Sequence, residues 1–339
     1  MTARAIAIDV MSGDFGPRVL VPASLRYLRQ HPELFAYLVG DRSEIAPLLD
    51  NSVRQNVSIV HTDDVIAMHE SPVAALRHKK RSSIHLAVEL VRNGEAGACL
   101  SAGNTGALMA ISKYLLRTID GIDRPAICGA LPSLYGHSYL LDMGANVDCE
   151  AEHLLQFALM ASVMVSLLER KPLPTVALLN NGEEAIKGNS QVREAARLLT
   201  EHERINYIGY VEGHRMFEAV ADIIVCDGFV GNIALKASEG VASYILQKIR
   251  QEVRADWISR CLSLFAWPAL YRVKNSIDPR VFNGASLLGL QGVVVKSHGH
   301  ADAKAFYHAL GQAHQLMESN MIQKLVQVFS KPNQQGDTA

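Results

Sequence analysis

Short apolar runs alternate with longer stretches of helical periodicity along almost the whole chain. Runs of this length that end in turn-forming residues are typical of buried strands. Their alternation with helices indicates βαβ units, in which helices cover both faces of a largely parallel sheet. The sequence predicts ten strands, at residues 5–8, 36–39, 57–60, 98–100, 126–130, 139–141, 176–179, 205–208, 223–225 and 293–296.

One predicted helix is much longer than the others and runs from Asn232 to about Leu262. An apolar residue recurs every fourth position along it, at Val241, Ile245, Ile249, Val253, Trp257 and Cys261. At about 1.5 Å per residue this helix is about 45 Å long, so we expect it to project from the body of the protein. Its apolar stripe needs a partner, and a second copy of the chain is the simplest one.

An apolar segment at residues 262–273 follows the long helix, and Pro268 within it keeps the helix from continuing. The large side chains of this segment are Leu264, Phe265, Trp267, Leu270 and Tyr271. Aromatic side chains with basic neighbours suit a membrane interface. A contact within the protein or between subunits is an equally open alternative, because an exposed apolar patch also marks protein partners.

The composition is that of a compact globular protein: 49% of the 339 residues are hydrophobic and the net charge is −1. This balance gives no indication of a nucleic-acid binder. Five scattered cysteines favour a reducing compartment over a disulfide framework. The most apolar helix, at residues 154–168, is shorter than a membrane span and contains polar residues, so we expect a core helix.

The loop Ser101-Ala-Gly-Asn-Thr-Gly-Ala107 connects a predicted strand to a predicted helix. Glycines let the backbone approach a ligand closely, and the free amides of a first helical turn attract anions. Asn104 and Thr105 add polar side chains to the same turn. The loop therefore suits phosphate or a phosphate-bearing substrate, although an ordinary turn capped by Asn or Thr is an open alternative.

Five further strands end in similar loops that combine glycine with polar side chains. Ligands bind at the carboxyl ends of strands in open parallel sheets, so we expect the six loops to share one cleft. Turn chemistry explains any one loop, but six in one chain favour a site. The five loops supply Asp14, Asp142, Asn146, Lys187, Asn189, Asp227, Asn232 and His298.

The motifs of serine hydrolases and phosphate-loop NTPases do not occur in the sequence. His298, His300 and Asp302 lack further ligands at suitable spacing, so we expect no metal. The predicted site instead offers amide and amine donors that place an anion and stabilise developing charge. For Lys187, an ion pair with Glu183 or Glu184 is the alternative. We expect Cys149 and Cys226, which lie near the loops, to be inert buried thiols.

In this order the motifs resemble the PlsX family of acyl-acyl-carrier-protein:phosphate acyltransferases, over residues 6–305. Ser12 stands where the family usually has glycine, which would tighten the first loop. The motifs that carry the resemblance are Asp9-Val-Met-Ser-Gly-Asp-Phe-Gly-Pro17, Ser101–Ala107, Asp142–Asn146, Leu178–Gly188, Asp227–Asn232, Gly284–Gly289 and His298-Gly299.

The resemblance implies an α/β fold with a Rossmann-like layered αβα arrangement, akin to isocitrate dehydrogenases and phosphotransacetylases, and a homodimer. We expect one domain at residues 1–329, a protruding helical hairpin at about 232–282 and a disordered tail at 330–339. The implied reaction transfers a fatty acyl group from acyl-acyl-carrier protein to inorganic phosphate, without a cofactor. The acyl phosphate product would feed a membrane glycerol 3-phosphate acyltransferase in phospholipid synthesis. The implied location is cytoplasmic, with peripheral contact between the segment at 264–271 and the membrane.

On this resemblance we expect Lys187 and Asn232 to hold the phosphate and polarise the thioester carbonyl. Asn104 and Thr105 would complete the cradle. The remaining residues with expected binding or supporting roles are Asp14, Ser101, Asp142, Asn146, Asn189, Asp227 and His298. Three alternatives stay open: a phosphotransacetylase-like enzyme that uses acyl-coenzyme A, an oxidoreductase on the related dehydrogenase fold, and a non-catalytic membrane scaffold.

Overall fold

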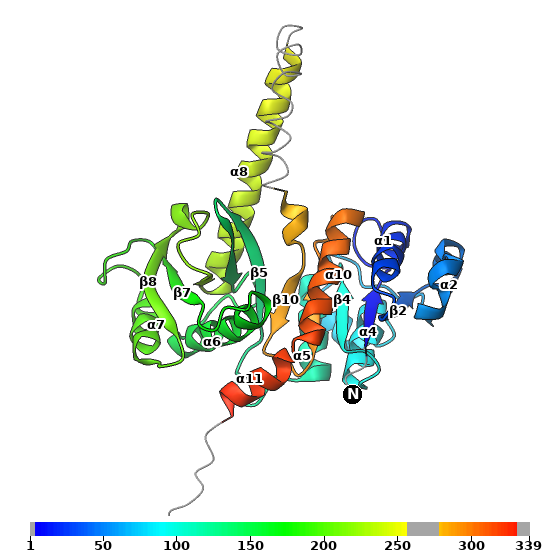
Figure 1. Ribbon diagram of the computed structural model, residues 1–339, viewed down its shortest axis with the longest axis horizontal. Coiled ribbons are helices and arrows are strands. Elements are labelled where there is room, and N and C mark those ends of the chain that lie inside the picture. Colours follow the sequence, from blue (N-terminus) through cyan, green and yellow to red (C-terminus); the bar gives the residue numbers. More distant parts are fainter. Residues whose placement is uncertain (1–3, 256–277, 331–339) are drawn as a thin grey trace, which may run out of the picture.

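A single sheet of 11 strands forms the centre of the protein in a computed structural model that describes residues 4–255 and 278–330 (Figure 1). The strand order is β3-β2-β1-β4-β11-β10-β5-β6-β9-β7-β8. The strands are β1 (Ala5–Asp9), β2 (Phe35–Gly40), β3 (Val57–His61), β4 (Ala98–Ser101), β5 (Ala126–Ser133), β6 (Gly136–Leu141), β7 (Thr175–Asn180), β8 (Asn206–Glu212), β9 (Ile223–Val225), β10 (Ala285–Leu288) and β11 (Val293–Lys296).

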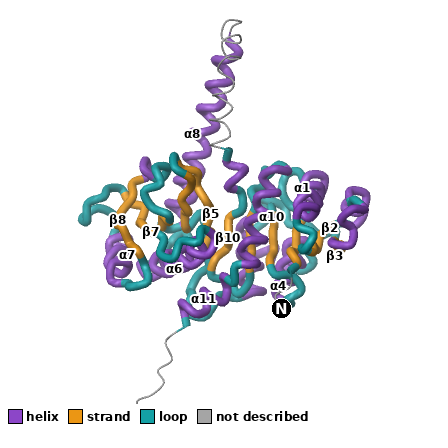
Figure 2. The backbone as a smooth tube through the Cα atoms, in the orientation of Figure 1, coloured by secondary structure: helices purple, strands orange, loops and turns teal. Residues whose placement is uncertain are grey.

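Helices connect most of these strands, and Figure 2 shows them on both sides of the sheet. The α-helices are α1 (Pro17–Gln30), α2 (Arg42–Ile45), α3 (Pro72–His78), α4 (Ser83–Arg92), α5 (Thr105–Leu116), α6 (Ala151–Leu168), α7 (Ser190–Glu201), α8 (Gly228–Ala255), α10 (Ala303–Glu318) and α11 (Met321–Phe329). Short 3-10 helices are η1 (Ala46–Leu48), η2 (Asn51–Asn56), η3 (Gly213–Arg215) and η4 (Pro279–Phe282).

All ten predicted strands are confirmed, and most strand pairs are parallel. The strand predicted at 205–208 begins one residue later and extends to Glu212. Strand β10 was not predicted; it has four residues and pairs antiparallel with β11 on one side and with β5 on the other. Its apolar run is too short to distinguish a strand from a turn.

Three consecutive antiparallel pairings divide the sheet between β11 and β6. On one side β1, β4 and β11 are parallel to one another, and on the other side β6, β9 and β7 are parallel. Because the chain direction reverses three times between β11 and β6, the strands of the two sets run in opposite directions. The six glycine loops therefore fall into two groups and do not follow one edge of a continuous parallel sheet.

The layered αβα arrangement is confirmed by the core. Residues of α1, α6, α10 and α11 form one hydrophobic cluster with one face of the sheet, and Phe157 and Phe306 are its largest fully buried side chains. Residues of α4 and α5, among them Ile84 and Ile111, form a second cluster on the other face. Within the described ranges, α6 alone has the length and hydropathy of a membrane span, and it is largely buried, as expected of a core helix.

Helix α8 projects from the body, as predicted (Figure 1). It begins at Gly228 and not at Asn232, because the loop motif at 227–232 is itself the first turn of the helix. The stripe residues Val241, Ile245 and Ile249 are 59%, 49% and 42% exposed. The predicted continuation to Leu262, the segment at 262–273 with its five proposed membrane residues, and the tail at 331–339 lie outside the described residues.

The first turn of α8 sits so close to the end of β6 that Gly231 cannot be replaced without displacement. A Cβ atom at Gly231 would lie 2.0 Å from the carbonyl oxygen of Asp142, whereas a Cβ at Gly240 on the same helix meets nothing within 4 Å. We expect Gly231→Ala to lower the free energy of unfolding by about 2–3 kcal/mol. The matched variant Gly240→Ala should raise it by about 0.5–1 kcal/mol through helix propensity. Urea denaturation measures both, and equal effects would contradict this packing.

Candidate functional site

A buried carboxylate joins the loops that follow β1 and β4. Asp9 is fully buried, and its carboxylate accepts hydrogen bonds from Ser101 Oγ at 2.6 Å and from the amide of Met11 at 3.3 Å. Ser12 Oγ also donates to it, so the residue that departs from the family pattern does tighten this loop. Burial raises the pKa of Asp9, and the hydrogen bonds oppose that rise.

The side chain of Asn104 is used to build the glycine loop. Its Oδ1 accepts from the amide of Ala107 at 3.0 Å, which caps α5. Its Nδ2 donates to the carbonyl oxygens of residues 67, 68 and 70 at 3.3, 3.0 and 2.9 Å. The capping interpretation left open by the sequence is therefore confirmed for Asn104. Thr105, the first residue of α5, is exposed, and its predicted contact with substrate stays a prediction.

The loop after β11 contacts both of these loops. The amide of Asp14 donates to the carbonyl oxygen of Gly299 at 2.9 Å, and His300 Nδ1 contacts the Asp14 carboxylate. A Cβ atom at Gly13 would lie 3.0 Å from the oxygen of Gly299 and 3.1 Å from the Cβ of Ala102. The loops after β1, β4 and β11 thus form one contiguous group, as the shared-edge argument predicted for these three.

Lys296, the last residue of β11, is a buried cation that sequence analysis did not select. It is 8% exposed, and its Nζ donates to the carbonyl oxygens of Ala102, at 3.4 Å, and Ser297. Burial lowers its pKa to about 8, and the charge of Asp9 opposes this. In the part of the chain that the structure describes, Lys296 forms no ion pair with a carboxylate. A buried ammonium group without a contacting counter-ion beside a glycine loop is a candidate anion anchor.

The sequence does contain one signal for Lys296, although the apolar pattern of the strand does not single this residue out. A buried strand of Val293, Val294 and Val295 ends in a charged residue directly before the Ser-His-Gly turn. A lysine at that place is either the first solvated residue of a loop or a buried functional group. Only the burial that the neighbouring loops impose separates these two alternatives.

His298 lies in the same loop, close enough to α8 for charges on that helix to act on it. Its Nδ1 accepts from the amide of His300 at 3.2 Å, which leaves Nε2 to carry the proton of the neutral ring. Although the ring reaches solvent, partial burial lowers the pKa of His298; Glu239 on α8 raises it, and Lys296 and Lys236 lower it further. The net lowering favours the neutral imidazole at pH 7, with Nε2–H as a donor.

A second group of loops is organised by Asp142 at the end of β6. The buried carboxylate accepts from the amide of Ile127 on β5 at 3.0 Å and from the amides of residues 144 and 145 at 3.2 and 3.0 Å. The amide and Nδ2 of Asn146 donate to it at 2.7 and 2.9 Å. Burial raises the pKa of Asp142 against these bonds. Asn146 also donates to the oxygen of Pro125 at 2.8 Å, so its side chain is used within the fold.

The start of α8 rests on this loop. Asp227 caps the helix by accepting from the amide of Val230 at 2.8 Å. The amide of Gly228 donates to the oxygen of Asn146 at 2.7 Å. Asn232 is half-buried and lies against Gly144, where a Cβ atom would be 3.4 Å from its Cβ and Cγ. The structure therefore brings Asp142, Asn146, Asp227 and Asn232 together, and positions Asn232 beside the positive end of a helix.

The loop after β7 carries Lys187, which is exposed. Its aliphatic stem lies over Gly182, where a Cβ atom would be 2.7 Å from its Cγ. Glu183 pairs with Arg215, and among the described residues Lys187 forms no ion pair, so the proposed pairing with Glu183 or Glu184 does not form. Asn189 caps α7 by accepting from the amide of Val192 at 2.8 Å. Because β7 is the neighbour of β9, this loop and the start of α8 follow adjacent strands.

Two observations relate the groups to each other. Met143 and Ala145 pack against the hydrophobic cluster that also contains Ala107 and Leu108 of α5, so both loops border the same part of the core. The charges of Glu239 and Lys236 on α8 reach His298. The groups at Asp9 and Asp142 are therefore related through a common hydrophobic cluster and through α8, in spite of their opposite strand directions. A cleft that also includes Lys187 stays a prediction.

The cysteines near these loops are not activated. Burial raises the pKa of the Cys149 thiol to about 11 and that of the Cys226 thiol well above its usual value. The four described cysteines are free thiols, and Cys99 and Cys128 also have pKa values raised by burial. Thiols in this state are poor nucleophiles, in agreement with the expectation of inert cysteines.

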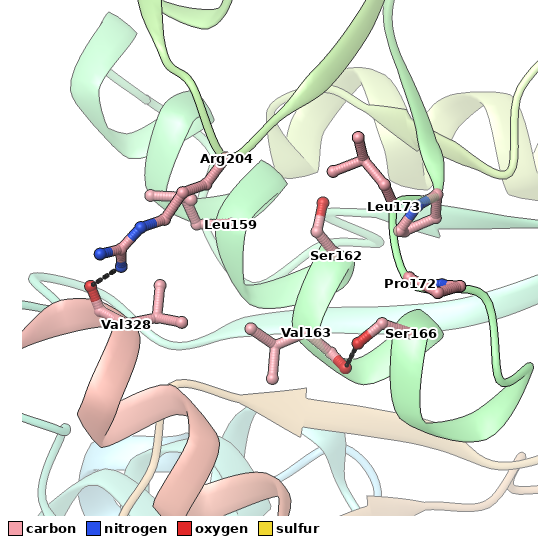
Figure 3. Close-up of a pocket in the computed structure, with 9 residues that line it drawn as sticks. Leu159, Ser162, Val163, Ser166, Pro172, Leu173, Arg204 and Val328 are labelled. Carbon is pink, nitrogen blue, oxygen red and sulfur yellow. Dashed lines mark hydrogen bonds between the residues drawn. The ribbon is translucent and has the colours of Figure 1, made fainter.

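A surface pocket lies elsewhere, between α6 and the segment before β7 (Figure 3). Its lining is mostly apolar, with Arg204 donating to the oxygen of Val328 at 3.4 Å across its edge. It shares no residue with the glycine loops. We therefore assign it no part in the candidate site.

The fold is an α/β fold that is also found in solved structures of other proteins. It is similar to a phosphotransacetylase from Streptococcus pyogenes, with a TM-score of 0.63, 16% identity, and coverage of 93% of this chain and 94% of that one. A branched-chain phosphotransacylase from Enterococcus faecalis V583 is also similar, with a TM-score of 0.56, 16% identity, and coverage of 93% and 99%. At these identities the likeness shows the fold alone.

Sequence comparison then defines the family. A family model described as "Fatty acid synthesis protein" matches residues 4–324. A phosphate acyltransferase of Methylococcus capsulatus is 52% identical over 308 residues, 90% of this chain and 91% of the relative. A phosphate acyltransferase of Legionella pneumophila (strain Paris) is 48% identical over 320 residues, 94% of each chain. The chain belongs to the fatty acid synthesis protein family, also called PlsX, which confirms the resemblance inferred from its motifs.

The burial of Lys296 predicts a pH-dependent cost to stability. Its pKa is about 8 in the folded protein and about 10.5 in the unfolded chain, so the unfolded chain binds more protons between these values. The free-energy cost of burying the charged Lys296 is therefore full below pH 8 and declines as the pH rises toward 10.5. We expect Lys296→Met to be more stable than the parent at pH 8, with an advantage that shrinks by about 1.5 kcal/mol at pH 9.5. Urea denaturation at both pH values tests this, and a constant difference would contradict it.

Proposed function

We propose that this protein transfers a fatty acyl group from acyl-acyl-carrier protein to inorganic phosphate. The observation that carries the proposal is the set of glycine loops beside a buried ammonium group, Lys296, in a chain whose relatives are named phosphate acyltransferases. The loops supply amide donors and lysines, and burial raises the pKa of both nearby thiols, so they are not activated. Such a site is suited to an anionic substrate that is itself the nucleophile.

In the proposed reaction an oxygen of hydrogen phosphate attacks the thioester carbonyl carbon. The new bond is the C–O bond of the acyl phosphate, and the bond that breaks is the C–S bond to the carrier protein. The departing thiolate takes the phosphate's remaining proton, so the atoms and charges balance without an enzyme nucleophile. Binding both reactants in line supplies the rate through orientation and charge stabilisation.

The proposal gives the residues separate tasks. Lys187 and Asn232 hold the phosphate and polarise the thioester carbonyl, with Thr105 and the first amides of α5 completing the cradle. Lys296 keeps the floor of the glycine loop electropositive. The remaining predicted residues position these groups through the contacts described above, namely Asp14, Ser101, Asn104, Asp142, Asn146, Asn189, Asp227 and His298.

Lys187 is the sharpest place to test the proposal, because it is exposed and its replacement leaves the core intact. We expect Lys187→Ala to lower phosphate-dependent thiol release by about 100-fold or more, the size typical of a lost transition-state donor. Lys324, at the far end of the chain on α11, provides the matched control Lys324→Ala, with unchanged activity. Release of thiol from acyl-acyl-carrier protein is followed with and without phosphate. Full activity of Lys187→Ala would exclude this task for the lysine.

Thiol release, together with a test of cofactor binding, separates the alternative functions. A phosphotransacetylase-like enzyme would release thiol from acyl-coenzyme A in preference to acyl-acyl-carrier protein. An oxidoreductase would bind a nicotinamide cofactor, which a fluorescence titration detects. A scaffold would show no phosphate-dependent turnover with either donor.

A homodimer is part of the proposal. The exposed stripe of Val241, Ile245 and Ile249 on a helix that leaves the body requires a partner, and a second α8 offers the same surface. Paired helices would also carry the apolar segment at 262–273 to one end of the assembly. That segment would then deliver the acyl phosphate to a membrane glycerol 3-phosphate acyltransferase from the cytoplasmic side.

The membrane contact has its own test. We expect the double variant Phe265→Glu and Trp267→Glu to lose binding to liposomes of anionic phospholipid, because charges at the headgroup boundary oppose insertion. Phosphate-dependent thiol release in solution should stay unchanged. Co-sedimentation with liposomes measures binding, with Gln251→Glu on α8 as a control of smaller charge change. Undiminished sedimentation of the double variant would refute direct contact through this segment.

A further inference from the structure

Two histidines that are far apart in the sequence meet at the surface where α1 ends against α10. His31 follows the last residue of α1, and His314 lies in the fourth turn of α10. Their ring centroids are 5.1 Å apart. One ligand atom each from His31, Glu33 and His314 lie within 4.8 Å of one another, and Glu318, the last residue of α10, is beside them.

His314 carries a buried nitrogen without a hydrogen bond. The residue is 6% exposed, and Nε2 has no hydrogen-bond partner among the described residues. Glu318 Oε1 lies 3.4 Å from Nε2, but the pair does not meet hydrogen-bond geometry. Buried polar atoms of side chains are normally paired, so an orphaned imidazole nitrogen that points toward other ligand atoms requires an explanation.

The other nitrogen of His314 is held by Tyr27. Nδ1 and the Tyr27 hydroxyl are 3.0 Å apart, and the phenol is buried. When Nδ1 carries the proton and donates to this oxygen, the lone pair of Nε2 is free. This is the second-shell arrangement that orients metal-binding histidines in proteins. Tyr27 also stacks on His31, with ring centroids 4.3 Å apart, and so positions both rings.

The ligand spacings suit a small transition-metal ion. His31 Nδ1 is 3.3 Å from Glu33 Oε1, and His314 Nε2 is 3.4 Å from Glu318 Oε1. Ligands at about 2.0–2.1 Å around a tetrahedral Zn²⁺ are separated by about 3.3 Å. The two pairs therefore have the separation of adjacent zinc ligands, and the flexible carboxylates can close the remaining distance between the pairs.

We propose that His31, Glu33, His314 and Glu318 form a binding site for a divalent transition-metal ion, with Zn²⁺ as the ion that this donor set favours. Two imidazoles and two carboxylates suit Zn²⁺ better than Mg²⁺, which prefers all-oxygen ligands and octahedral geometry. The ion ties the end of α1 to α10. Helix α1 begins directly after the loop that follows β1, and α10 begins directly after the loop that follows β11. The metal site connects these two helices near their C-terminal ends, away from the loops.

Zinc titration tests the site directly on the full chain without an affinity tag. After treatment with EDTA and its removal, calorimetric titration with Zn²⁺ at pH 7.5 should show one equivalent bound, and Mg²⁺ should show none. At a free Zn²⁺ concentration one hundred times the dissociation constant, we expect the Tm to rise by about 3–4 °C. Titration with Co²⁺ should give the visible absorption of a tetrahedral complex.

Variants assign the binding to these residues. We expect His31→Ala and Glu33→Gln each to weaken Zn²⁺ binding at least tenfold, and both variants keep the two groups of the contact between the Tyr27 hydroxyl and His314 Nδ1. His214→Ala removes an exposed histidine of η3 and should leave the affinity unchanged. Absence of Zn²⁺ binding to the parent, or equal affinity of His31→Ala and His214→Ala, would overturn the proposal. Phosphate-dependent turnover serves as an independent readout, so failure of the metal site leaves the proposed function testable.

Discussion

The buried carboxylate of Asp142 is the constraint on which the second half of the candidate site depends. It sits at the end of β6, fully removed from water, and accepts hydrogen bonds from β5 and from successive amides of its own loop. A buried charge is tolerable only with such partners, and any loss of one would leave it uncompensated. The loop folded by Asp142 receives the first turn of α8, so Asn232 and the projecting helix take their places from this one group.

Asp9 has the corresponding task at the end of β1, with hydroxyl donors in place of most of the amides. The two acidic groups are satisfied by the fold, whereas Lys296 is satisfied only by carbonyl oxygens. Burial of an ammonium group that bonds only to carbonyl oxygens lowers the stability of the folded protein, and the lowered pKa of Lys296 reflects this. A protein that keeps such a group beside a glycine loop has given up stability for a positive charge at that place, which is common at functional sites.

Much of the fold could be predicted, because strand and helix periodicities are local properties of the sequence. Ten strands and the projecting helix follow from apolar runs and from a stripe of every fourth residue. Residues 285–288 were missed because a short strand paired on both sides gives no alternating pattern. The start of α8 was misplaced because Asp227-Gly-Phe-Val-Gly resembles a loop, and only contact with the loop of Asp142 shows that it is the first turn of a helix.

By itself the sequence determined the order of the elements, the family, and the loops in which the polar chemistry is concentrated. Only the tertiary structure decided which polar groups remain available and which are consumed in building the loops. Asn104 and Asn146 looked like substrate ligands in the sequence, but their amides bond to carbonyl oxygens from distant segments. Lys296 and the meeting of His31 with His314 depend on burial and on contacts between residues far apart in the chain. Hydrogen-bond satisfaction and desolvation are set by such long-range neighbours, and local periodicity carries no record of them.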